Sequence, residues 1–82
     1  MKTRIDVWVT IFSQASKRSP ESVRKSFSKI SEYRTPPSYL FTPITDAEYE
    51  LSVQAAKKKI IPKVRKWLKR NSLESMFDFF GP

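Results

Sequence analysis

The sequence predicts a small single α+β domain with helices packed on a small sheet, in the order β-α-β-α-α. Three observations lead to this prediction. A chain of 82 residues has room for one hydrophobic core only. An early segment alternates in the period of a strand. Two later segments repeat their apolar residues every three or four positions, as amphipathic helices do.

The first predicted strand spans residues 4–13, RIDVWVTIFS. The β-branched residues on one side of this strand are Ile5, Val7, Val9 and Ile11. Such residues suit a pleated surface. Trp8 and Phe12 fall on the other side. We expect both aromatic residues to cover a second packing layer, with an exposed platform for stacking bases as the alternative.

A helix is predicted from about residue 20 to 33. Ser19 is a typical N-cap residue, and Pro20 suits the first helical position. An apolar stripe along this helix consists of Val23, Phe27 and Ile30. The helix should end before the prolines at 36–37, because a residue that precedes proline avoids the helical conformation.

Residues 38–44, SYLFTPI, are predicted to form a short strand. Pro43 restricts this strand to an edge position or to a few residues, because proline has no N–H to donate to a neighbouring strand.

The segment 45–70 has two interpretations. On the preferred one, Thr45 and Glu48 form a capping box and a helix follows, with Pro62 on its solvent side. On the alternative, residues 49–53 form a third strand and a helix begins at about residue 56. The element order would then be β-α-β-β-α.

Positive charge is concentrated in residues 57–70, KKKIIPKVRKWLKR. The chain has a formal net charge of +8, and this segment contains eight basic residues and no acidic one. At 100° per residue its apolar side chains fall within an arc of about 120°, and every basic residue except Lys57 lies on the far side. The segment therefore predicts a basic amphipathic helix.

A helix face of this kind can follow the phosphates of DNA or RNA, because clustered cations release the counterions held by the polyanion. The expected phosphate contacts on this helix are Lys58, Lys59, Lys63, Arg65, Lys66, Lys69 and Arg70. A second cluster, around the first predicted helix, comprises Lys17, Arg18, Arg24, Lys25 and Lys29. We expect Arg24, Lys25 and Lys29 of this cluster to contribute contacts as well. Low sequence specificity is expected, since no base-reading motif is present.

Three other interpretations of the basic face remain. It is also typical of a solvated surface that needs no partner. It could dock on a larger acidic protein, which would make the chain an inhibitor or adaptor module. A membrane surface is less favoured, because the apolar stripe of the helix is needed for the core of so small a domain. We expect a cytoplasmic location, since no stretch is apolar and long enough to span a membrane.

Enzymatic functions are not expected. The chain contains no Cys and no His, which excludes thiol nucleophiles, His bases and zinc sites built from Cys or His ligands. Its single Gly leaves no glycine-rich phosphate loop. The acidic residues include no set spaced as metal ligands. The sequence therefore predicts no catalytic residues, no metal and no cofactor.

The C-terminal segment, residues 72–82, is unusually apolar for the end of a chain. We expect a short helical turn in this tail that docks back onto the core of the domain. The alternative is a contact with a partner protein or with a second copy in a homodimer, made by Met76, Phe77 and Phe80.

Overall fold

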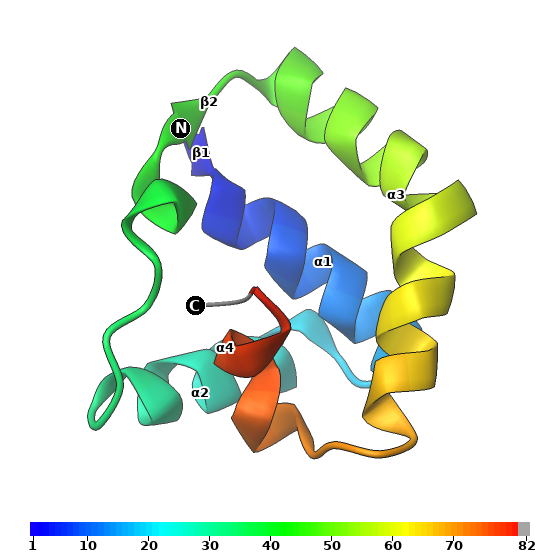
Figure 1. The fold of residues 1–82 in the computed structure, drawn as a ribbon. Coiled ribbons are helices and arrows are strands. Elements are labelled where there is room, and N and C mark those ends of the chain that lie inside the picture. The colour runs from blue at the N-terminus through cyan, green and yellow to red at the C-terminus, as the bar shows by residue number, and fades with distance from the viewer. Residues whose placement is uncertain (81–82) are drawn as a thin grey trace.

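Helix α1 (Arg4–Ser16) lies at the centre of the computed structural model, and the other helices surround it (Figure 1). The structure describes residues 1–80. The surrounding helices are α2 (Pro20–Ser31), α3 (Asp46–Leu68) and α4 (Met76–Phe79). The smaller elements are strands β1 (Lys2–Thr3) and β2 (Pro43–Ile44) and the 3-10 turns η1 (Ser38–Phe41) and η2 (Leu73–Ser75).

The strand predicted at residues 4–13 is wrong, because these residues form most of α1. The buried residues of α1 are Val7, Val9, Ile11, Phe12, Ser13 and Ala15. They face several directions around the helix axis, as expected for a helix that is packed on more than one side. A helix that is buried on several sides can therefore carry apolar residues at alternating positions, as a strand does. Tertiary packing here overrides the preference of Val and Ile for strands.

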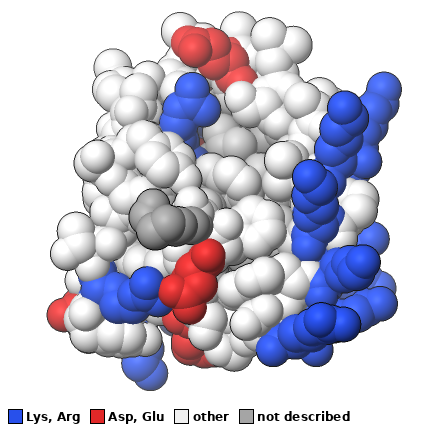
Figure 2. All heavy atoms as spheres, viewed as in Figure 1, with Lys and Arg blue, Asp and Glu red and all other residues white. Residues whose placement is uncertain are grey.

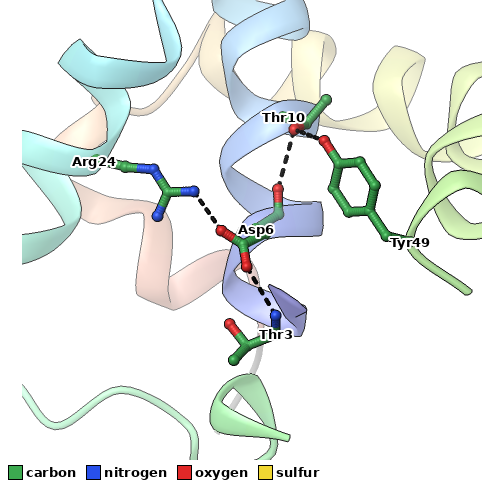
Figure 3. A network of polar contacts seen from close by, with 5 residues as sticks. All are labelled: Thr3, Asp6, Thr10, Arg24 and Tyr49. Atoms are coloured by element: carbon green, nitrogen blue, oxygen red, sulfur yellow. Dashed lines mark hydrogen bonds and ion pairs between the residues drawn. The ribbon is translucent and has the colours of Figure 1, made fainter. Parts of the chain in front are cut away.

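A network of polar contacts fixes the start of α1 and joins it to two other helices (Figure 3). The backbone N–H of Thr3 donates to Oδ2 of Asp6 at 2.8 Å, and Oδ1 of the same carboxylate accepts from Arg24 of α2. The hydroxyl of Thr10 donates to the backbone carbonyl of Asp6 at 3.0 Å. It also lies 2.7 Å from the hydroxyl of Tyr49 in α3.

This network holds the Asp6 side chain in its charged form. Burial raises the pKa of the carboxyl, but hydrogen bonds from Arg24 and from the Thr3 backbone, with the charges of Arg24 and Lys2, together lower it below its ordinary value of 3.8. The ionised carboxylate is therefore favoured by folding.

The helix predicted at about 20–33 is present as α2, and the last part of the strand predicted at 38–44 is present as β2. Both elements are shorter than predicted. In α2 the Ser19 hydroxyl accepts from the backbone N–H of Ser22 at 3.1 Å, which is an N-cap contact. The strand predicted at 38–44 is reduced to two residues, because η1 occupies its first part and buries Leu40. Strand β2 pairs antiparallel with β1, with Ile44 opposite Lys2.

The helical interpretation of residues 45–70 is confirmed, and the alternative third strand at 49–53 is wrong. Thr45 and Glu48 exchange hydrogen bonds at 3.1 Å each, as a capping box requires. The prediction of a small domain that combines helices with a small sheet is confirmed. The predicted order β-α-β-α-α is replaced by β-α-α-β-α-α, apart from the 3-10 turns.

The C-terminal segment docks onto the core of its own chain, as predicted. Leu73, Met76 and Phe77 are buried. The rings of Phe77 and Phe27 lie 5.0 Å apart, and those of Phe80 and Trp8 lie 4.9 Å apart. The aromatic residues of the tail therefore pack against α1 and α2. The last two residues of the predicted tail, 81–82, lie outside the described residues.

The substitution Asp6→Asn should lower the free energy of unfolding at neutral pH by about 1–2 kcal/mol, because it weakens both the helix cap and the pairing with Arg24. The folded-state pKa of Asp6 lies below the unfolded value. The stabilisation is therefore complete at neutral pH and is lost as the pH falls below about 4, so the two proteins should converge in acid. Urea unfolding at several pH values measures this difference, with Glu50→Gln as an exposed control. Equal stability of wild type and Asp6→Asn at neutral pH would contradict the role of the network.

The substitution Phe77→Ala should lower the free energy of unfolding by about 3–5 kcal/mol, because the side chain is buried against Phe27. Phe41 is 54% exposed, so the control Phe41→Ala should cost less than about 1 kcal/mol. Chemical denaturation followed by circular dichroism measures both values. If the Phe77→Ala variant does not fold, Phe77→Leu replaces it in the comparison with Phe41→Ala. Similar losses at the two positions would show that the tail is not part of the core.

Candidate nucleic-acid interface

Helix α3 separates an apolar side from a basic side. Its buried residues, Val53, Ala56, Ile61 and Val64, face α1 and the core. All eight basic residues of 57–70 are exposed. Figure 2 shows Lys and Arg side chains along the part of the visible face where α3 runs, with no acidic side chain among them. We call the exposed basic residues of 57–70 the basic face.

The described part of the protein does not neutralise the basic face. The ion pairs found among residues 1–80 are Arg24 with Asp6 and Arg34 with Asp78, and neither involves α3. Residues 51–73 contain no Asp or Glu. The charges of the basic face are therefore left to solvent ions or to a partner.

Like charges repel one another along this helix. Lys59 and Lys63 are spaced four residues apart within α3, and such a pair costs about 0.2–0.5 kcal/mol when both members carry the same charge. The helix dipole favours cations in the last turn of α3 but gives no support to Lys59 near the middle. Binding of a polyanion would relieve this repulsion.

The basic face follows a curved path. Figure 1 shows α3 curving around α1. Pro62 is exposed within the helix and has no N–H to donate to the carbonyl of Lys58. A proline on the outer side bends a helix toward the core that it covers. The cations thus lie along the convex side of α3.

The structure does not join the cluster on α2 to the basic face. Helices α2 and α3 lie on different sides of α1 (Figure 1). Lys25 and Lys29 are exposed on α2, whereas the Arg24 side chain pairs with Asp6. Arg24 therefore serves the packing of α1 against α2. A role of Lys25 and Lys29 in binding stays a prediction.

The turn between α1 and α2 does lie near the basic face. Ser16 lines a shallow hollow together with Arg65 and Lys69. Lys17 follows Ser16 directly and adopts a positive φ of 60°, and Arg18 comes next. A left-handed conformation costs a residue other than glycine about 1–2 kcal/mol. Lysine occupies a position where glycine is the usual residue.

A second hollow combines aromatic rings with cations. It is lined by Lys63, Lys66, Trp67, Arg70, Asn71 and Phe79. Trp67 is one of the apolar residues that fall within the arc of about 120° predicted from the sequence, whereas the structure leaves it half-buried at the border of the basic face. The helical geometry of the sequence could have predicted this border position of Trp67, because Trp67 lies about 40° from Lys63 around the helix axis.

The residues predicted as partner or dimer contacts lie mostly inside the domain. Met76 is 2% exposed and Phe77 is 3% exposed, while Phe80 is partly buried against Trp8. This conformation therefore presents neither Met76 nor Phe77 to another molecule.

No family model, curated protein or solved structure is significantly similar to the chain. No helix within residues 1–80 has the length and apolarity to cross a membrane. Over the same residues, no three acidic, His or Cys side chains are grouped as metal ligands would be. The distribution of charge and aromatic surface is thus the main guide to function.

The substitution Lys17→Gly should raise the free energy of unfolding by about 0.5–1 kcal/mol, because glycine adopts a positive φ without a steric penalty. The control Lys17→Ala removes the same charge but keeps the penalty, so it should not stabilise the protein. Thermal unfolding of the two variants separates the effect of backbone conformation from that of charge. If the Gly variant were no more stable than the Ala variant, the strain at this turn would be refuted.

Proposed function

We propose that the protein binds nucleic acid through the basic face, contacting phosphates with low sequence specificity and without catalysing a reaction. The observation that carries this proposal is that, within residues 1–80, no acidic side chain forms an ion pair with any of the eight exposed cations of the basic face. Such a surface attracts a polyanion from a distance and releases condensed counterions on contact.

The length of the basic face fits a run of phosphates. From Lys58 to Leu68, where α3 ends, the helix advances by about 15 Å at the helical rise of 1.5 Å per residue. Phosphates along one strand of B-DNA are spaced about 3.4 Å apart in projection, so this distance covers about four of them. The cations of the basic face are thus numerous enough to meet every phosphate along that length.

The composition of the basic face supports contact with phosphates rather than with base edges. Lysine predominates, and only Arg65 and Arg70 offer the forked donor that reads guanine. A lysine ammonium acts as a point charge and accepts many geometries. Low sequence specificity follows from this chemistry.

The double substitution Lys58→Gln with Lys69→Gln should weaken binding to a duplex oligonucleotide at low salt. Each lost phosphate contact should make the slope of log affinity against log salt less steep by about 0.9. The matched control is Lys25→Gln with Lys29→Gln, which removes two charges from α2 and should have a smaller effect. Fluorescence anisotropy with a labelled duplex at two salt concentrations measures both affinity and slope.

Absence of binding at low salt, or binding that ignores salt, would refute the proposal. Equal losses in the two double variants would show that binding is not confined to the basic face. If the protein instead captures one acidic protein in a nuclease-resistant manner and has no affinity for nucleic acid, it is an adaptor or inhibitor.

A further inference from the structure

The hollow beside the basic face has an apolar interior and a positively charged rim. Trp67 and Phe79 supply its aromatic walls, and the cations at its rim are Lys63, Lys66 and Arg70. Its volume of about 430 Å³ lies in the range of pockets that hold small ligands. Trp67 and Phe79 are both partly exposed, so their rings are open to a ligand from solvent.

The two aromatic walls are held in place from behind. The fully buried ring of Phe12 lies 6.4 Å from Trp67 and 5.8 Å from Phe79, in edge-to-face geometry with both. Trp67 and Phe79 also contact each other, at 5.8 Å and 78°. A ligand that stacks here would meet rings that are already ordered, so it would lose little side-chain entropy on binding.

The charge of the neighbouring Asp78 does not oppose an anion at this place. Asp78 precedes Phe79 in α4, but its Oδ1 accepts a hydrogen bond from Arg34 at 2.6 Å. This pairing offsets its charge, so the rim of the hollow stays positive.

We infer that this hollow takes an unpaired nucleobase, which stacks against its aromatic wall at Trp67 while the cations at its rim bind the flanking phosphates. The inference rests on the proposed function and specifies its ligand as single-stranded nucleic acid. Aromatic side chains beside a basic groove are how proteins hold unpaired bases. The bases of a duplex are stacked on both sides, so a duplex offers this surface only its phosphates.

The test compares four labelled ligands of equal length by anisotropy at low salt. They are single-stranded DNA, single-stranded RNA, duplex DNA, and an abasic strand that keeps the phosphates without the bases. Wild-type protein should bind the strands that carry bases more tightly than the duplex and the abasic strand. The relative affinity for DNA and RNA identifies which of the two is the ligand.

The substitution Trp67→Leu should weaken single-strand binding by about 5- to 100-fold while changing duplex binding less than twofold. Trp8→Leu is the matched control, because Trp8 packs on the same Phe12 and Phe79 as Trp67 but does not line the hollow. If Trp67→Leu does not fold, Trp67→Phe replaces it. In a Trp8→Phe background Trp67 is the only tryptophan, and its fluorescence should change with single strands but not with the abasic strand.

Equal affinity for single-stranded, duplex and abasic ligands, with unchanged Trp67 emission, would overturn the base-binding hollow and leave phosphate binding by the basic face intact. Equal effects of Trp67→Leu and Trp8→Leu on single-strand binding would also overturn it. Failure to bind any of the four ligands at low salt would overturn both proposals.

Discussion

The need to bury α1 on several sides governs this structure. The helix carries apolar residues around most of its circumference, and an 82-residue chain has little else with which to cover them. Phe12 at its centre is fully buried and meets the rings of Trp67 and Phe79. Helix α2, helix α3 and the tail each contribute one apolar face, so each of them leaves its other face to solvent.

This division of faces determines what α3 can offer to a partner. Ile61 and Val64 are committed to the core, so a lipid surface would compete with the domain itself for the same side chains. The basic face carries no such commitment. Trp67 sits on the boundary between the two sides, which is why one residue can pack on Phe12 and still line a hollow open to solvent.

Capping residues and apolar stripes in the sequence predicted the amphipathic helices α2 and α3. They failed for α1, which is packed on several sides. Ser19 with Pro20 and Thr45 with Glu48 mark helix starts before apolar stripes, and both helices are present. Helix α1 has no single stripe, and its alternation obscured the start signal between Thr3 and Asp6. The angular positions of the basic residues around the helix axis were sufficient to predict that the basic face is exposed. The aromatic hollow could not be predicted, because α1 and the tail together decide where Phe79 meets Trp67.

The positions of the acidic residues help to explain why the basic side of α3 is unopposed. Glu21, Asp46 and Glu48 lie in the first turns of α2 and α3, where the helix dipole favours negative charge. A hydrogen bond from the Thr45 backbone lowers the pKa of Glu48, so this cap stays ionised. Asp6 and Asp78 pair with arginines from another element. These acids thus stabilise the fold where they stand and leave the outer side of α3 unopposed. A charge asymmetry of this kind would orient the molecule in the field of the proposed polyanion before contact is made.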